Sequence, residues 1–379
     1  MGWSGLAGWA RPGGWPGRAG SWLALLAIAA GVTACTGGGS AASSDGGTAS
    51  SDGGTASSAA SSASPAASVP VAGGPATLQQ QYERVVASVL PSVVQITTSQ
   101  GLGSGVVYDA RGDIVTNAHV VGSATSVRVR LPSASKSLAA TVLGVFAPDD
   151  LAVIRVQNPP ATLRPATFGR SGAVRVGEIV LAMGNPLGLT GTVTDGIVSA
   201  TGRTVSEGEG SSAVLISAIQ TSAPINPGNS GGALVSLSGQ VIGIPTLAAS
   251  DPQMGGAAVG IGFAIPSDTV TSIAPQLIAT GKVTNSGRAA LGVTVETVVS
   301  ASGEPAGVGV VSVTPGGAAA QAGIRAGEVI LAVNGQPTDS APALQSALAT
   351  LKPGDKVRIR LSRNGTQSTV TATLGTLTG

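Results

Sequence analysis

Histidine and cysteine each occur only once in this sequence of 379 residues, and charged residues make up just 10% of it. The single cysteine, Cys35, excludes an intrachain disulfide and a metal site built from several cysteines. The formal net charge is +2, with no basic run and no acidic tail, so we expect no nucleic-acid partner. No Walker-type glycine loop is present either. The sequence therefore predicts neither a metal nor a cofactor.

Aromatic residues are also scarce, at 2% of the chain, and their distribution is uneven. All four tryptophans fall within the first 22 residues, whereas the 57 glycines are abundant. This contrast indicates a β-rich, turn-rich globular protein that follows a segment of a different kind.

Residues 1–35 have the pattern of a signal peptide. Arg11 and Arg18 precede a short apolar run at 22–30, which is less than the ~20 residues of a membrane span. The sequence VTAC that ends at Cys35 resembles the lipobox of bacterial lipoproteins, in which the cysteine is lipidated. The alternative is an uncleaved signal anchor. Both predict a globular part outside the cytoplasmic membrane and tethered to it.

Residues 36–76 consist almost entirely of serine, alanine, glycine and threonine. The sequence SDGGTAS occurs at 44–50 and again at 51–57. Because this composition cannot form a core, we expect a flexible, disordered linker.

Residues 77–285 alternate short apolar segments with glycine turns. A helix is expected to begin at a capping Thr77 and to end at Pro91, and a second helix carries Val270, Ile273 and Leu277 with Gly281 as its cap. Between them, twelve strands are predicted, which favours an all-β barrel or sandwich: 93–97, 105–108, 114–116, 126–131, 141–146, 151–156, 178–183, 193–200, 214–219, 232–235, 241–245 and 259–265.

Ser230 lies in the sequence NPGNSGGAL at 226–234, where glycines surround one serine. A tight turn of this kind can expose a hydroxyl and direct backbone N–H groups at an oxyanion. The sequence also fits the G-x-S-x-G elbow of α/β-hydrolases. Their chain order is serine, acid, histidine, however, and the single histidine, His119, precedes Ser230, which excludes that fold.

Two catalytic orders remain for a serine, a histidine and an acid. The order acid, histidine, serine would need a carboxylate before His119, such as Glu83, Asp109 or Asp113. In the order histidine, acid, serine, Asp149 and Asp150 are the candidates that directly precede a clean apolar strand. Asp150 adjoins that strand, so we expect it, and not Asp149, to orient the imidazole. The remaining carboxylates between His119 and Ser230 are Glu178, Asp195, Glu207 and Glu209.

Several motifs, in this order, resemble the HtrA/Deg family of serine endopeptidases. They are TNAHVV at 116–121, DLAVI at 150–154, AMGNPLGL at 182–189 and NPGNSGGAL at 226–234. The resemblance extends from about residue 78 to the C-terminus. It implies a mainly β, chymotrypsin-like fold, with two six-stranded barrels and the catalytic triad between them.

The resemblance also implies roles for particular residues. Ser230 would be the nucleophile, His119 the general base and then acid, and Asp150 the residue that orients it. The backbone N–H groups of Gly228 and Ser230 would form the oxyanion hole. The substrates would be unfolded or damaged proteins, and the segments at 243–246 and 260–265 match those that line the specificity pocket.

Other expectations concern assembly and control. The family implies a homotrimer, with Tyr82 near the contact, whereas the short loop at 99–104 argues against large cages. Ser222 stands where the family usually has an acid, and Pro245 where asparagine or serine is common, so specificity is expected to differ. Asn229 carries no charge, so it cannot pair with a new amino terminus. We therefore expect no activation by N-terminal cleavage.

Residues 288–375 are expected to form a small β domain with a helix near 344–351. The turns at 334–335 and 364–365 are Asn-Gly, which is typical of hairpins. The sequence GGAAAQAGIRAGEVILAVNG at 316–335 resembles a PDZ domain. That resemblance makes Leu291, Gly292 and Val293 the loop that binds the carboxylate of a peptide C-terminus.

The sequence leaves competing functions open. An ATP-independent endopeptidase is the main hypothesis. A PDZ scaffold or chaperone with little proteolysis is the alternative, and an esterase would share the same acyl-transfer chemistry.

Overall fold

The computed structural model describes residues 75–99, 101–132, 134–185, 191–206, 214–226, 228–251 and 256–379. The expected signal peptide, Cys35 and nearly all of the expected linker lie outside the described residues. None of the described helices is both long and apolar enough to cross a membrane.

Six strands close into a first barrel, in which every strand pairs antiparallel with its neighbours in the order β1-β2-β3-β6-β5-β4. Its interior is filled by β-branched residues such as Val94, Ile96 and Ile154, none of which is exposed. The strands are β1 (Val93–Thr97), β2 (Leu102–Val107), β3 (Asp113–Asn117), β4 (Ser126–Arg130), β5 (Leu138–Phe146) and β6 (Leu151–Val156).

A second barrel follows, in the order β10-β11-β12-β9-β8-β7, so the expected pair of six-stranded barrels is confirmed. Its strands are β7 (Ile179–Gly184), β8 (Thr192–Ser206), β9 (Val214–Thr221), β10 (Ala233–Ser236), β11 (Val241–Asp251) and β12 (Gly256–Pro266). Strands β8, β11 and β12 are longer than their hydrophobic patterns predict. Register shifts interrupt the β8–β9 and β11–β12 pairings, and such irregularities break the alternation on which the sequence prediction depends.

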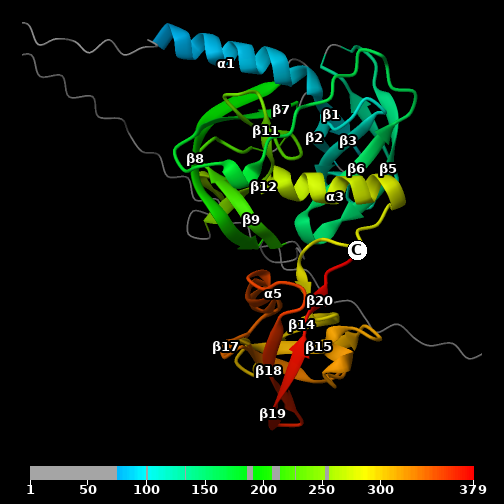
Figure 1. Ribbon diagram of the computed structural model, residues 1–379, viewed down its shortest axis with the longest axis vertical. Helices are drawn as coiled ribbons and strands as arrows, with labels where there is room; N and C mark the ends of the chain where they lie inside the picture. Colours follow the sequence, from blue (N-terminus) through cyan, green and yellow to red (C-terminus); the bar gives the residue numbers. More distant parts are fainter. Residues whose placement is uncertain are drawn as a thin grey trace, which may run out of the picture. The chain divides into compact units, whose positions relative to one another are not determined.

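One hydrophobic core joins the two barrels. It contains Phe146 and Leu151 from the first barrel together with Leu181, Met183 and Ile265 from the second. Helix α3 (Ser267–Thr280) adds Val270, Ile273 and Leu277 to this core and contacts β5, β6 and β11 (Figure 1). Gly281 ends α3 with a φ of 71°, as the sequence predicts.

Helix α1 (Pro75–Val89) starts earlier than expected: it begins at Pro75, so Thr77 lies inside the helix and does not cap it. Proline suits the first position of a helix, where its missing N–H removes no hydrogen bond. Val85 and Val89 bury one face of α1 against the shared core, and the short helix η1 (Leu90–Ser92) leads into β1. The other short helices of the barrels are α2 (Ala118–Val121), η2 (Ala147–Asp149) and η3 (Ser171–Ala173).

The C-terminal domain has its own core and a sheet in the order β14-β15-β16-β18-β19, with β17 paired to β16. The Asn-Gly turns are found where predicted, since Asn334 and Asn364 both have a φ of 50° and the following glycines are also positive. The strands are β14 (Val293–Val299), β15 (Pro305–Val313), β16 (Val329–Val333), β17 (Gln336–Pro337), β18 (Lys356–Arg363) and β19 (Thr366–Thr373).

Two helices and one further strand pair complete this domain. Helix α4 (Ala318–Gln321) follows β15, and α5 (Ala341–Ala349) begins at the capping residue Ser340. Strands β13 (Ala289–Ala290) and β20 (Gly375–Thr376) pair antiparallel, which brings the first and last segments of the domain together.

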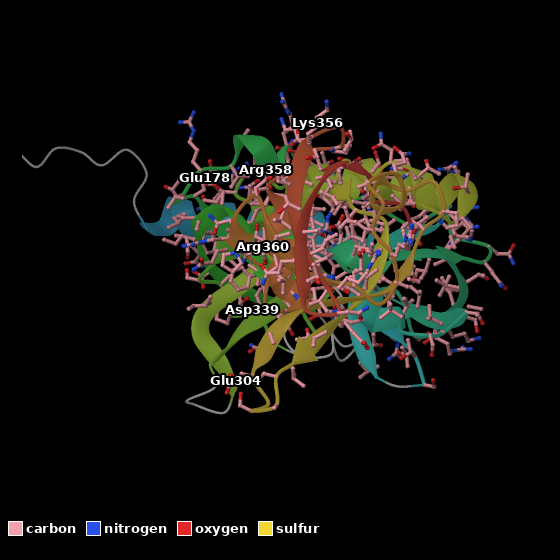
Figure 2. All side chains as sticks on the ribbon, turned by 90° about the horizontal axis from the view of Figure 1, so that it is seen from below. Glu178, Glu304, Asp339, Lys356, Arg358 and Arg360 are labelled. Atoms are coloured by element: carbon pink, nitrogen blue, oxygen red, sulfur yellow. The ribbon has the colours of Figure 1, made fainter. Side chains whose placement is uncertain are left out.

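Strand β18 shows why the sequence pattern succeeds in this domain. Val357, Ile359 and Leu361 alternate with basic residues and are 0–1% exposed. The intervening side chains of Lys356, Arg358 and Arg360 point away from the core (Figure 2).

Candidate active site

His119 lies in α2, which immediately follows β3. Strands β3 and β6 pair so that Asn117 faces Leu151, which places the start of α2 beside Asp150. The backbone N–H of Ala118 donates to the Asp150 carbonyl at 3.0 Å, and Asn117 Nδ2 donates to it at 3.2 Å. The histidine is therefore positioned by the backbone of the acid as well as by its side chain.

The Asp150 carboxylate holds His119 at two points. Oδ1 accepts from the His119 backbone N–H at 2.9 Å, and Oδ2 lies 2.8 Å from the ring Nδ1. An ionised carboxylate only accepts hydrogen bonds, so the ring proton belongs on Nδ1 and Nε2 is the basic nitrogen. The acid side chain is 2% exposed and the imidazole 42%, which leaves the imidazole accessible to a substrate.

The backbone at Asp150 is unusual, since its φ is 50° and its ψ is 40°. Residues with a side chain rarely adopt this left-handed conformation, although aspartate tolerates it better than most. Asp150 occupies it directly after η2, where its N–H donates to the Ala147 carbonyl at 3.0 Å. This turn directs the carboxylate to His119 while β6 continues into the core.

The neighbouring Asp149 points elsewhere. Its carboxylate pairs with Arg288, 2.5 Å away, and the same guanidinium donates to the Pro148 carbonyl at 2.8 Å. Asp149 is 3% exposed, and burial raises the pKa of its carboxyl although the charge of Arg288 lowers it. Asp150, and not Asp149, is therefore the carboxylate that contacts the histidine.

Ser230 lies in the turn between β9 and β10, as the glycine pattern predicts. The Asn229 N–H donates to the Asn226 carbonyl at 3.0 Å, and the Gly232 N–H donates to the Asn229 carbonyl at 2.9 Å. Gly228 and Gly231 have φ values of 106° and 80°, which strongly favour glycine. Neither the Gly228 N–H nor the Ser230 N–H donates to an acceptor in the described part of the chain.

Thr246 joins the serine to the acid, a role that the sequence does not reveal. The Ser230 hydroxyl donates to the Thr246 carbonyl at 3.0 Å, and the Thr246 hydroxyl donates to Asp150 Oδ2 at 2.5 Å. Thr246 is 3% exposed and comes from the second barrel, whereas Asp150 belongs to the first. No local pattern relates two residues 96 positions apart; the sequence marks Thr246 only as part of a pocket segment.

The two departures in the pocket region have simple structural roles. The hydroxyl of Ser222 accepts from the Ile197 N–H at 3.0 Å, where an acid is usual. The carbonyl of Pro245 accepts from the Gly231 N–H at 3.0 Å, which uses the backbone and not the side chain. Ser222 thus binds the backbone of β8, and Pro245 binds the backbone of the turn that carries Ser230. Within the described residues, no cluster of histidine, cysteine and carboxylates could hold a metal ion.

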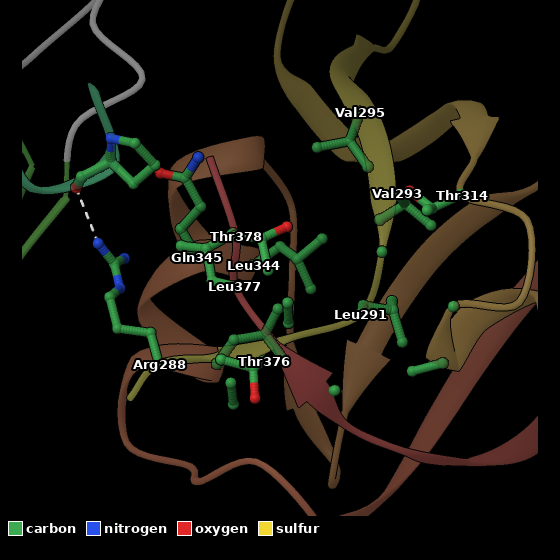
Figure 3. Close-up of a pocket in the computed structure, with 18 of the residues that line it drawn as sticks. Arg288, Leu291, Val293, Val295, Thr314, Leu344, Gln345, Thr376, Leu377 and Thr378 are labelled. Carbon is green, nitrogen blue, oxygen red and sulfur yellow. Dashed lines mark hydrogen bonds between the residues drawn. The ribbon is translucent and has the colours of Figure 1, made fainter. Parts of the chain in front are cut away.

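The expected carboxylate loop of the C-terminal domain borders a pocket of about 410 Å³. Leu291, Gly292 and Val293 line it together with Leu344 and Leu348 of α5 (Figure 3). Gly292 has a φ of 74°, and its carbonyl accepts from the Thr314 N–H at 2.9 Å. Strand β14 starts at this loop and is the edge strand of its sheet, so a peptide could pair with it.

Comparison with family models identifies two domains in the chain. Residues 103–244 match the trypsin-like peptidase domain, and residues 289–374 match the PDZ domain. The first range includes His119, Asp150 and Ser230, and the second begins at β13.

Characterised relatives extend the match over most of the chain. Serine protease PepD of Mycobacterium tuberculosis is 41% identical over 81% of this chain and 68% of its own length. The periplasmic pH-dependent serine endoprotease DegQ of Escherichia coli is 41% identical over 74% of this chain, but over only 60% of its own length. The periplasmic serine endoprotease DegP of the same species is 41% identical over 71% of this chain and 56% of its own length.

Solved structures agree with the sequence matches. The HtrA-type protease AlgW with a decapeptide has a TM-score of 0.52 at 32% identity, covering 78% of this chain and 98% of that one. A serine endoprotease from Yersinia pestis has a TM-score of 0.51 at 36% identity, with the same coverage. The chain belongs to the HtrA family of trypsin-like serine proteases.

Proposed function

We propose that this chain is an ATP-independent endopeptidase in which Ser230 attacks the peptide bond. His119 takes the proton of the hydroxyl through Nε2 and then gives it to the leaving amine, while Asp150 stabilises the imidazolium. The observation that carries this assignment is the double contact of Asp150 with His119, together with the Thr246 bridge from Asp150 to Ser230.

The Gly228 and Ser230 N–H groups are the proposed donors to the oxyanion. They lack an internal acceptor within the described residues, as a site that waits for a substrate oxygen requires. Donors fixed in advance are effective because they need no rearrangement when charge develops on that oxygen.

Unfolded or damaged polypeptides are the proposed substrates. Solved relatives hold a decapeptide or a tripeptide, which supports a polypeptide chain as the ligand. The proposed role of the PDZ domain is to bind peptide C-termini at Leu291, Gly292 and Val293, next to the free edge of β14. Such binding would order the loops around the catalytic turn.

The site of action is proposed to lie outside the cytoplasm. The relatives DegQ and DegP are named periplasmic, and the first 35 residues of this chain have the pattern of a signal peptide. Lipidation at Cys35, tethering to the bacterial cytoplasmic membrane and assembly into a homotrimer with Tyr82 near the contact are further proposals. Mass spectrometry of the membrane fraction and light scattering test them separately.

The central experiment compares the native chain with a Ser230→Ala variant on a reduced, carboxymethylated protein and on the same protein in its folded form. We expect the native chain to produce internal fragments of the unfolded substrate, and the variant to be slower by at least about a thousand-fold. Suppressed aggregation with no fragments from either chain would favour the scaffold or chaperone. Turnover of small esters alone would favour an esterase.

A second experiment tests the PDZ proposal. A short hydrophobic peptide with a free C-terminus should bind the chain, whereas the same peptide with an amidated C-terminus should bind at least about tenfold more weakly. Equal binding of the two peptides would contradict a carboxylate loop at 291–293.

A further inference from the structure

Ser104, on β2 of the first barrel, is a fully buried serine whose hydroxyl lies beneath the turn that carries Ser230. The hydroxyl donates to the Gly228 carbonyl at 2.5 Å and accepts from the Asn185 N–H at 2.7 Å. Its backbone N–H donates to the Ser230 carbonyl at 2.9 Å. One residue of the first barrel therefore holds the catalytic turn of the second barrel at two carbonyl groups.

These two carbonyls belong to Gly228 and Ser230, the same residues whose N–H groups are the proposed oxyanion donors. Gly228 has a φ of 106°, a conformation that glycine adopts easily because it has no side chain. The glycine backbone alone therefore does little to fix the orientation of the two adjoining peptide groups. The Gly231 and Gly232 N–H groups donate to backbone carbonyls, and so does the Asn229 N–H, which belongs to the same peptide group as the Gly228 carbonyl. The carbonyl of Gly228 is instead held by a side chain, that of Ser104.

The strand around Ser104 is packed too closely to shift. A Cβ atom at Gly231 would lie 2.2 Å from the Ser104 carbonyl oxygen, and a Cβ at Gly103 would lie 2.6 Å from a methyl group of Val120. The same short stretch of β2 thus contacts the turn of Ser230 and the residue that follows His119. The hydrogen bond from the Ser104 hydroxyl therefore attaches the turn to a closely packed strand of the first barrel.

We propose that Ser104 is a positioning residue for the oxyanion hole. By fixing the Gly228 carbonyl it fixes the conformation of Gly228, and so the direction in which the Gly228 N–H points. This inference rests on the proposed function. In its absence the turn could rotate at Gly228, and the N–H would leave the position where the negative oxygen forms. Ser104 itself does not touch the substrate.

Ser104→Ala tests this role, and the chain contains a matched control. Ser267 is equally buried, and its hydroxyl donates to the Gly169 carbonyl at 2.8 Å, so Ser267→Ala removes the same kind of bond elsewhere. Removal of a whole oxyanion donor costs roughly 100- to 1,000-fold in rate, so a donor that is only misplaced should cost about 10- to 100-fold. We expect that loss in kcat for Ser104→Ala with KM changed less than about twofold, and none for Ser267→Ala.

Two further measurements separate positioning from loss of stability. A peptide boronic acid, which imitates the tetrahedral intermediate, should bind Ser104→Ala more weakly by the same factor as kcat falls. The acidic limb of the pH profile should stay in place, because the contacts of His119 with Asp150 are not altered. If Ser104→Ala fails to fold, Ser104→Cys retains a similar shape with a weaker donor and should show an intermediate kcat.

Unchanged kcat and unchanged boronic acid affinity in a folded Ser104→Ala or Ser104→Cys variant would overturn the inference. So would a loss expressed only in KM, or an equal loss in Ser267→Ala. If the native chain itself cleaves no peptide and binds no boronic acid, the proposed function fails first and the inference fails with it.

Discussion

At the scale of single residues, Thr246 connects the serine and the acid of the candidate site. It is bonded to Asp150 through its side chain and to Ser230 through its carbonyl. The acid thus receives hydrogen bonds from both barrels, and these fix its orientation toward His119.

Replacement of Thr246 by valine keeps the shape and removes the donor to Asp150. A hydrogen bond to a charged group contributes about 1.5–3 kcal/mol, so we expect the free energy of unfolding to fall by that amount. We also expect kcat to fall, with KM nearly unchanged, because a less constrained acid holds the imidazole less well. Urea unfolding and steady-state kinetics measure the two effects.

Thr338→Val is the control for that substitution. Thr338 is 1% exposed, and within the described residues its hydroxyl has no hydrogen-bond partner. The change should therefore be neutral or stabilising and leave kcat unchanged. A Thr246→Val variant as stable and active as this control would contradict the role of Thr246.

The presence of a single histidine makes the pH dependence unusually clear to interpret. Protonation of His119 removes the basic nitrogen that must accept the proton of Ser230, so kcat/KM should fall as the pH is lowered. The midpoint of that fall should coincide with the titration of the one histidine signal in NMR spectra. Midpoints that differ by more than about one pH unit would exclude His119 as the general base.

At the scale of elements, the turn from Asn226 to Gly232 requires glycine for two separate reasons. Gly231 has a φ of 80°, and a Cβ atom there would lie 2.2 Å from the Ser104 carbonyl. The positive φ is a conformational reason, and the close approach of the Ser104 carbonyl is a steric one. Another glycine of the chain has the same φ but no such close contact.

Gly365, in the turn between β18 and β19, also has a φ of 80°, but no atom of the described residues lies within 4 Å of its added Cβ atom. We expect Gly365→Ala to lower the stability by about 1–2 kcal/mol through its backbone alone and to leave activity intact. Gly231→Ala should cost more stability and abolish activity, because the turn must move. Thermal unfolding and peptide cleavage compare them, and equal effects would show that the close contact is unimportant.

The elements themselves were largely predictable from the sequence, and the reasons are local. Alternation identifies a strand such as β18, whose inward residues are Val357, Ile359 and Leu361, and Asn-Gly identifies the hairpins. The proline at the start of α1 was missed because Thr77 resembles a cap. The extra length of β11 was missed because its pairing with β12 shifts register.

The candidate site was only partly predictable, because its connections are distant in sequence. His119, Asp150 and Ser230 could be selected from their order and from motifs that surround each of them. Thr246 and Ser104 could not, since the bonds that matter join positions 96 and 124 residues apart. A serine between two glycines in β2 has no local property that reveals what lies beneath it.

At the scale of the whole molecule, the pair formed by Asp149 and Arg288 joins two distant parts of the chain beside the candidate site. Arg288 lies just before β13, and Asp149 adjoins Asp150. The side chain of Asp149 is 5% exposed and that of Arg288 is 14% exposed. Burial raises the pKa of Asp149, so the pair has not fully offset the cost of removing its charge from water.

Arg288→Ala should therefore be much more damaging than Asp149→Asn. Removal of the guanidinium leaves a buried, unpaired carboxylate and should cost about 3–5 kcal/mol at neutral pH. Asp149→Asn leaves the guanidinium of Arg288 without its carboxylate, but that group is more exposed and keeps its hydrogen bond to the Pro148 carbonyl, so the cost should be smaller. A carboxyl whose folded-state pKa is raised opposes folding above its unfolded pKa of about 3.9, so the deficit of Arg288→Ala should shrink as the pH falls through the pKa of Asp149. Urea unfolding of both variants and the native chain at several pH values tests this, and a deficit that does not depend on pH would contradict it.

The most direct test of the account is covalent labelling of the full chain by a fluorophosphonate, followed by mass spectrometry of its peptides. Such reagents require both an activated serine and a formed oxyanion hole. The account predicts one adduct, on Ser230, that is absent from Ser230→Ala. Labelling without any peptide would indicate a hole that is formed at rest, and labelling only with a hydrophobic C-terminal peptide would indicate control through the PDZ domain. No adduct under either condition, or an adduct on another serine, would contradict it.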